Sequence, residues 1–287
     1  MKCIAIDMDG TLLSSSQEVA DEEKDAIQYA RRQGVEIVIC TGRSKEEALL
    51  PLQKAGLELP MICVNGAQTW REDGTLLDSD LLEKEQFTRI QEVLKDIGIY
   101  FELYTNEGNY TTDYDKAISV LVNIFMGNQG SQANYEHLTR VAQKHVSDGR
   151  LHLVEDYDTL IRKESVELLK ILCFSFHKGS LNEARERLQA YEDIAVSSSG
   201  KENLEITNVE AQKGLALERF VHKNGWTLEE TMAIGDNYND LSMFKMAGTA
   251  VAMGNAEDEI KNHANEITKT NEAHGVAHAI LKTLQVR

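Results

Sequence analysis

The stretch that most constrains the fold of this chain is "IAIDMDGT", residues 4–11. A short, continuous apolar run such as residues 4–6 is typical of a strand that is covered on both faces. Two carboxylates, Asp7 and Asp9, follow it directly. They repel each other and are costly to remove from water unless a cation or hydrogen bonds offset their charge. The stretch is therefore either the solvated edge of a loop or the floor of a site.

Strand and helix patterns alternate through the first 65 residues. The apolar runs "KCIAI", "VEIVIC" and "MICVNG" predict strands, and helical spacing of apolar residues predicts helices between them. Ser44 and Glu47 are expected to form a capping box at the start of the second helix, and Pro51 is expected to kink or split that helix. The order strand, helix, strand, helix, strand predicts a parallel, doubly wound sheet.

The middle of the chain has a different pattern. Asp73-Gly74 predicts a hairpin, and a second one is expected to turn at residues 106–109. Helices over 134–146 and 181–191 and strands over 167–176 and 194–199 follow, after which the first alternation returns. We therefore predict one parallel-sheet domain, residues 1–82 and 200–287, interrupted by an α+β insert over residues 83–199.

Charge and composition exclude several classes of partner. With 30 Lys and Arg against 47 Asp and Glu, the net charge is −17, which repels nucleic-acid phosphates and anionic membranes. We expect neither nucleic acid nor a membrane as a partner, although a local cation still permits a small anionic substrate. No apolar run approaches the ~20 residues of a membrane span, and no N-terminal signal is evident, so a cytoplasmic location is expected. The four cysteines fit no metal-binding spacing and are expected to be buried, reduced thiols.

Four polar segments follow predicted strands or begin a predicted helix. Ligands of open α/β sheets bind beyond the carboxyl ends of the strands, so these segments are expected to lie together. Carboxylates near one point favour a hard cation such as Mg²⁺, and a lysine with a Thr-Gly turn and a helix N-terminus favours a phosphate. The segments are Asp7–Thr11, Thr41-Gly42-Arg43, Lys213-Gly214 and "GDNYND", which contains Asp236, Asn239 and Asp240.

This set of groups is what phosphoryl transfer requires. Asp7 is the candidate nucleophile, which would attack phosphorus and form an aspartyl phosphate. Asp9, two residues on, is the candidate general acid for the leaving oxygen and then the base for the hydrolytic water. Mg²⁺ and Lys213 would stabilise the charge that develops.

The motifs "DMDGTLL", "TGR", the helix-initial Lys213 and "GDNYND" resemble, in order, the four motifs of the haloacid dehalogenase superfamily. More narrowly, the chain is similar to the Cof-type phosphatases, whose type IIB α/β cap lies between the second and third motifs. The resemblance implies a Rossmann-like core with an inserted cap domain. It implies Mg²⁺ held by the side chains of Asp7 and Asp236 and by the backbone carbonyl of Asp9, with Asp240 in support. It also implies a phosphate held by the backbone of Met8 and by Thr41, Gly42, Lys213 and Asn239.

Several alternatives remain open at this point. The first hypothesis is a Mg²⁺-dependent phosphatase of small phosphorylated metabolites such as sugar phosphates; the others are a phosphosugar mutase of the same superfamily and a catalytically silent sensor of such metabolites. Arg43 is expected to form either an ion pair within the core or a phosphate contact. Asn65 is expected in a tight turn, with or without a place in the substrate pocket. The sequence gives neither the substrate nor the oligomeric state.

Overall fold

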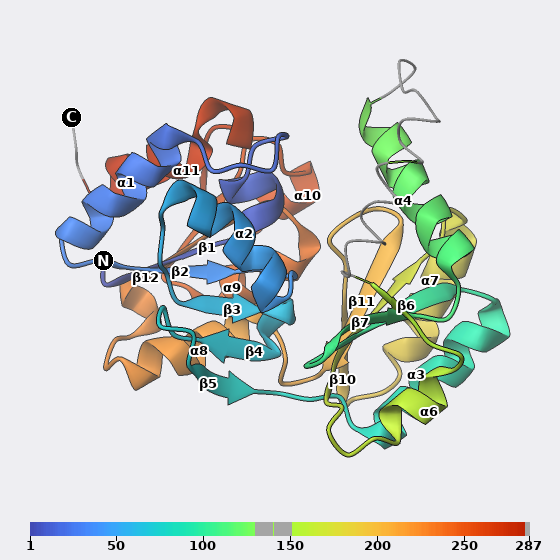
Figure 1. Cartoon of the computed structure of the whole chain (residues 1–287). Helices are drawn as coiled ribbons and strands as arrows, with labels where there is room; N and C mark the ends of the chain where they lie inside the picture. Colours follow the sequence, from blue (N-terminus) through green and yellow to red (C-terminus); the bar gives the residue numbers. More distant parts are fainter. Residues whose placement is uncertain (130–139, 141–150, 285–287) are drawn as a thin grey trace. The chain divides into compact units, whose positions relative to one another are not determined.

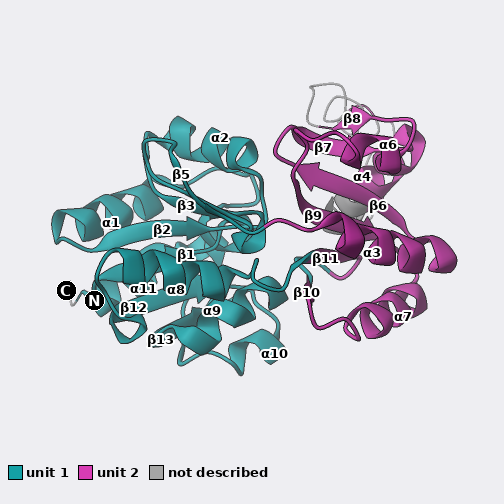
Figure 2. Ribbon diagram, turned by 90° about the horizontal axis from the view of Figure 1, so that it is seen from below, with its two compact units in different colours: residues 1–80, 197–200, 207–287 teal, residues 81–196, 201–206 magenta. Residues whose placement is uncertain are grey.

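The computed structural model describes residues 1–129, 140 and 151–284, and these form two compact units (Figures 1 and 2). Unit 1 comprises residues 1–80, 197–200 and 207–287, and unit 2 comprises residues 81–196 and 201–206. The helix expected over residues 134–146 lies, except for Arg140, outside the described residues. That unit 1 is the catalytic core and unit 2 the cap stays a prediction.

Unit 1 is built on an eight-stranded sheet in the order β14-β13-β12-β1-β2-β3-β4-β5. Neighbouring strands from β14 to β3 run parallel, whereas β4 and β5 are joined antiparallel, as the Asp73-Gly74 hairpin predicts. The predicted doubly wound sheet is therefore confirmed. The strands are β1 (Cys3–Ile6), β2 (Glu36–Cys40), β3 (Met61–Cys63), β4 (Gln68–Trp70), β5 (Leu76–Ser79), β12 (Thr231–Gly235), β13 (Thr249–Ala252) and β14 (Glu266–Ile267).

Helices cover this sheet because its central strands are apolar on both sides. Every residue of β1 is fully buried, and alternate residues point to opposite faces. Cys3 and Ala5 pack with the apolar residues of α8 and α9, while α1 packs beside α11 (Figure 1). The helices are α1 (Asp21–Arg32), α2 (Lys45–Ala55), α8 (Lys213–Lys223), α9 (Leu241–Met246), α10 (Asp258–Lys261) and α11 (Gly275–Thr283), with the short turns η1 (Met8–Leu12), η2 (Val64–Gly66), η5 (Leu228–Glu230), η6 (Tyr238–Asp240) and η7 (Asn271–Ala273).

Unit 2 is a mixed α+β unit. Its six-stranded sheet has the order β10-β11-β9-β6-β7-β8, in which β11, β9, β6 and β7 pair antiparallel. Apolar residues of α3 and α7 pack on one face of this sheet. The strands are β6 (Tyr100–Thr105), β7 (Gly108–Thr111), β8 (His152–Leu153), β9 (Leu168–Phe174), β10 (Ile194–Ser197) and β11 (Asn203–Asn208), and the helices are α3 (Lys84–Ile97), α4 (Tyr114–Gln129), α6 (Tyr157–Ile161) and α7 (Lys178–Leu188).

Helix α2 begins as its sequence predicts and continues through a proline. Ser44 Oγ accepts the backbone N–H of Glu47, and the Glu47 side chain accepts the backbone N–H of Ser44. Of the kink or split expected at Pro51, the split does not occur, because α2 runs unbroken over Lys45–Ala55. Since proline has no N–H, the carbonyl of Glu47 loses its partner within the helix. The guanidinium of Arg43 donates to that carbonyl instead, at 3.5 Å.

All four cysteines are buried and free, and each lies in a strand, namely β1, β2, β3 or β9, as expected. Within the described part of the chain, no helix is both long enough and apolar enough to cross a membrane.

The start of α11 is held by a buried acid from α1. Glu23 is 1 % exposed, and its carboxylate accepts the backbone N–H of Ala277 in the first turn of α11. Burial raises the pKa of Glu23 to about 7, although the N–H groups of Ala277 and Val276 act in the opposite direction. A carboxyl whose pKa is higher in the folded than in the unfolded state stabilises the fold below its unfolded pKa. That contribution is lost as the pH rises through the folded pKa.

We therefore expect Glu23→Gln to remove a pH dependence of stability. The amide keeps an oxygen for Ala277, so the variant should match the wild type below about pH 4 and exceed its free energy of unfolding by about 3 kcal/mol near about pH 8. Urea unfolding across this range measures the difference, and groups that both proteins share cancel in it. The exposed Glu58→Gln is the control. Parallel stability curves for Glu23→Gln and wild type would contradict the prediction.

Candidate active site

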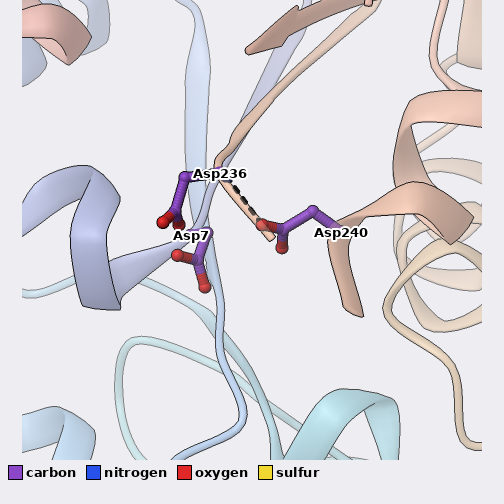
Figure 3. Close-up of side chains that lie close together, drawn as sticks. All are labelled: Asp7, Asp236 and Asp240. Carbon is purple, nitrogen blue, oxygen red and sulfur yellow. Dashed lines mark hydrogen bonds between the residues drawn. The ribbon is translucent and has the colours of Figure 1, made fainter. Parts of the chain in front are cut away.

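The residues that directly follow three neighbouring strands lie at one edge of the unit 1 sheet. Strand β1 lies between β12 and β2, and all three run parallel. Asp7 follows β1, Thr41 follows β2 and Asp236 follows β12. Parallel strands end at the same edge, so these residues are brought together although they are far apart in sequence. Figure 3 shows the side chains of Asp7, Asp236 and Asp240 close to one another at this edge.

Lys213, the first residue of α8, is the cation of the cluster. Its Nζ donates to Oδ1 of Asp7 and to Oδ1 of Asp240, each at 2.7 Å, and its side chain is fully buried. Burial by itself would lower the pKa of Lys213, but the carboxylates of Asp240 and Asp7 outweigh it and hold that pKa above the usual lysine value. Lys213 therefore carries a positive charge in contact with Asp7.

Asp240 holds Lys213 and the backbone that follows β12 through hydrogen bonds. Its Oδ1 accepts from Lys213, and its Oδ2 accepts the backbone N–H groups of Asp236 and Asn237 at 2.9 and 3.0 Å. The close fit requires a glycine at position 235, because a Cβ there would lie 2.4 Å from Oδ2 of Asp240. Both oxygens of Asp240 are thus committed to protein donors.

Asp7 and Asp236 carry more negative charge than the protein around them offsets. Burial raises the pKa of Asp236 to about 7 and raises that of Asp7 well above the usual aspartate range; the charge of Asp240 adds to both shifts, and Lys213 opposes them. Oδ1 of Asp236 accepts from the hydroxyl of Thr11 at 3.0 Å. One ammonium thus faces three buried or half-buried carboxylates in the described structure.

The donor set fits a hard divalent cation. One oxygen each from Asp7, Asp236 and Asp240 lie within 4.8 Å of one another. Oxygen ligands with excess negative charge are what Mg²⁺ prefers. Because Asp240 is already hydrogen-bonded through both oxygens, Asp7 and Asp236 are the better candidates for side-chain ligands.

Asp9 takes a different direction from the cluster. Its carboxylate is half exposed and accepts from the guanidinium of Arg43 at both oxygens, from Nε at 2.7 Å and from Nη2 at 2.5 Å. Of the two roles left open for Arg43, the structure therefore shows the ion pair. Asp9 is not among the carboxylates that gather around Lys213.

The remaining candidate residues lie on segments that adjoin the cluster. Met8 is buried in η1, and Gly42 is half-buried after β2. Thr41 is fully buried, and its hydroxyl accepts the backbone N–H of Arg43 at 3.1 Å. Asn239, in η6, is buried and donates its side-chain N–H to Oδ1 of Asn65 at 3.2 Å. The roles predicted for these residues are not visible in these contacts and stay predictions.

Asn65 joins two candidate segments that the sequence treats separately. Besides accepting from Asn239, it donates its backbone N–H to the carbonyl of Thr41 at 2.9 Å. Both Val64 and Asn65 have left-handed backbone, with φ of 51° and 57°, a costly conformation for non-glycine residues that is often found at functional sites. In the sequence, the Asn-Gly pair at a strand end indicates a turn here, but it does not indicate that Asn65 contacts Thr41 and Asn239.

Comparisons with known proteins show what the chain as a whole is similar to. A family model for haloacid dehalogenase-like hydrolases matches residues 4–280. Phosphatase YwpJ of Bacillus subtilis is 34% identical, covering 97% of this chain and 98% of its own length. The 5-amino-6-(5-phospho-D-ribitylamino)uracil phosphatase YwtE of the same species is 32% identical, with 98% and 97% covered. A haloacid dehalogenase-like hydrolase structure from B. subtilis has a TM-score of 0.88 at 34% identity over 98% and 99% of the chains. A subclass IIB sugar phosphatase, BT4131, shares the fold with a TM-score of 0.77 at 21% identity over 100% of both chains.

Proposed function

We propose that this chain, which belongs to the haloacid dehalogenase-like hydrolases and is a phosphatase, hydrolyses small phosphate monoesters such as sugar phosphates. The reaction proceeds through a phosphorylated Asp7. The observation that carries the proposal is the contact of a buried lysine with Asp7 at the edge of a parallel sheet, beside Asp236. The relatives named above are phosphatases, and the name of one of them specifies a small phosphorylated metabolite.

The first half of the reaction forms the covalent intermediate. One carboxylate oxygen of Asp7 attacks phosphorus, and the bond from phosphorus to the ester oxygen breaks. The leaving oxygen takes a proton from Asp9, which acts as general acid. Oδ1 of Asp7 is held by Lys213, so the nucleophile is oriented before substrate binds. Lys213 also offsets the negative charge that the phosphoryl group brings into a buried site.

The second half returns Asp7 to its free form. Asp9, now a carboxylate, takes a proton from water, and the water oxygen attacks phosphorus. The bond between phosphorus and Asp7 breaks, which releases inorganic phosphate. Thr41, Gly42, Asn239 and the backbone of Met8 are proposed to hold the phosphoryl oxygens. When bound by Asp7, Asp236 and the carbonyl of Asp9, Mg²⁺ would supply the charge that neutralises the phosphoryl group and the surplus carboxylates. A cytoplasmic location and the absence of nucleic-acid partners stay predictions.

The proposal predicts Mg²⁺-dependent phosphate release. Purified protein with Mg²⁺ should liberate inorganic phosphate from members of a panel of sugar phosphates, nucleotides and cofactor phosphates. Chelation with EDTA should lower the rate about 100-fold or more, because the surplus carboxylates then repel the substrate. Isomerisation of a sugar phosphate with little release, dependent on a bisphosphate activator, would identify a mutase instead. Binding without turnover of any ester would identify a sensor.

A further inference from the structure

We infer that Asn255 and Asn271 are positioning residues that hold the turn containing Asp9 and Gly10 against Asp236, and that they thereby tighten the binding of Mg²⁺. The inference deepens the proposed function and rests on it, since it concerns the cation of that reaction. Its basis is a set of hydrogen bonds that all lie within unit 1.

The turn over residues 8–11 packs directly against Asp236. Its central residues have φ and ψ of −77° and 119° at Asp9 and of 76° and −1° at Gly10, which are close to the values of a type II turn. A Cβ at Gly10 would clash with Oδ2 of Asp236, and the hydroxyl of Thr11 donates to Oδ1 of the same carboxylate at 3.0 Å. The backbone carbonyl of Asp9, a proposed ligand of Mg²⁺, belongs to the central peptide of this turn. The position of the turn therefore sets the distance between that carbonyl and Asp236.

Asn255 reaches the turn from the next strand of the sheet. It follows β13, which runs parallel to β12, so the topology brings Asn255 to the same edge as Asp236. Its Nδ2 donates to the carbonyl of Gly10 at 2.8 Å, and its Oδ1 accepts the backbone N–H of Asn271 at 3.0 Å. Because the carbonyl can only accept and the backbone N–H can only donate, these partners fix the orientation of the amide. Asn255 thus joins the turn to the segment that begins η7.

Asn271 holds the same loop at a second point. Its Nδ2 donates to the carbonyl of Leu13 at 2.9 Å. These contacts involve none of the carboxylates of the cluster, so they hold the loop whatever the charge on those groups. An amide also adds no charge beside the cation, whereas a lysine or an arginine in its place would repel it. The two asparagines therefore position the loop without opposing the cation that the site is proposed to bind.

Mg²⁺ and Ca²⁺ differ in how strictly they require such positioning. Mg²⁺ needs near-ideal octahedral geometry with oxygens at about 2.0–2.1 Å, whereas Ca²⁺ accepts flexible geometry with oxygens at about 2.3–2.6 Å. A turn that is no longer held by Asn255 or Asn271 can shift the carbonyl of Asp9 relative to Asp236. The loss of affinity should then fall on Mg²⁺ more than on Ca²⁺. A loss of charge or of folded protein would affect both cations alike.

The test measures the dissociation constants of Mg²⁺ and Ca²⁺ by isothermal titration calorimetry, with each metal alone and no substrate. Leucine at either position keeps the size of the side chain and removes its hydrogen bonds. We expect Asn255→Leu and Asn271→Leu each to raise the Kd of Mg²⁺ about 10-fold and that of Ca²⁺ less than about 3-fold. The Mg²⁺ concentration for half-maximal phosphate release should rise by the same factor as the Kd of Mg²⁺. At saturating Mg²⁺, kcat should return to within about 3-fold of the wild type.

Asn224→Leu is the matched control, because Nδ2 of Asn224 also donates to a backbone carbonyl, that of Phe220 at 2.9 Å, at the end of α8 opposite Lys213. It should leave both dissociation constants unchanged. Urea unfolding without metal identifies the folded variants, and alanine replaces leucine at a position where the leucine variant does not fold. Equal changes for the two cations, or no change for either, would overturn the inference and leave the proposed function intact. A wild-type protein that binds no Mg²⁺ and releases phosphate without it overturns both.

Discussion

Replacing Asp7 with asparagine is expected to abolish turnover, by about 10⁴-fold or more in kcat, and to stabilise the metal-free protein. The loss of turnover follows because the amide oxygen is too weak a nucleophile to form the covalent intermediate. The gain in stability follows because burial and the charge of Asp240 raise the pKa of Asp7, which means that its charged form is disfavoured in the fold. Lys213 keeps Asp240 as a partner after the substitution.

Two measurements check the Asp7→Asn prediction. Single-turnover phosphate release measures the loss of the covalent step. Urea unfolding without Mg²⁺ should show a gain in the free energy of unfolding that declines as the pH falls, since the wild-type carboxyl then protonates. Added Mg²⁺ should stabilise the wild type more than the variant. Asp258→Asn, at a side chain that is 99% exposed, should change neither quantity. Retained turnover in Asp7→Asn would exclude the covalent mechanism.

Much of the unit 1 fold was predictable because its central strands are buried on both faces. A strand covered by helices on both sides has an apolar residue at nearly every position, so "CIAI" and "EIVIC" are recognisable in the sequence without any partner. The strict alternation with helices then allows few arrangements other than a parallel sheet. Strands such as β8 and β14 have two residues each, too few to carry a pattern.

One helix of unit 2 has clear start and stop signals in its sequence. Helix α3 begins with a capping box between Glu83 and Gln86 and ends at Gly98 in left-handed backbone. Its buried Phe87, Ile90 and Leu94 follow helical spacing. The local sequence and the tertiary structure therefore agree over α3, and this helix was predictable from its sequence.

For the candidate site, the sequence indicated which segments meet and gave less on where side chains point. The order of strands brings Asp7 and Asp236 to one edge, since that follows from topology. The direction of the Asp9 side chain depends on Arg43, and that of Arg43 depends on Gln17 and on a carbonyl that Pro51 leaves free. Such contacts join residues whose mutual distance is set by the tertiary fold, and no spacing rule encodes them.

Lys213 occupies a position that costs helix stability, which indicates that its charge serves the site. It is the first residue of α8, where the helix dipole disfavours a cation. It is also fully buried, where a charge is costly unless it is paired. Among the residues that the structure describes, the contacts with Asp7 and Asp240 are those that offset both penalties. The cluster therefore depends on this one ammonium for its internal balance of charge.

Lys213→Met is accordingly expected to lower the free energy of unfolding by about 3–5 kcal/mol and to remove phosphatase activity. Methionine keeps the apolar stem and leaves the carboxylates unbalanced. The double variant Lys213→Met with Asp240→Asn should lose less stability than the single variant, because one of those carboxylates is then neutral. Urea unfolding of both, with the exposed Lys2→Met as control, measures the difference. A loss as small as that of Lys2→Met would mean that water or a cation already balances Asp7 and Asp240, and that Lys213 does not hold the cluster together.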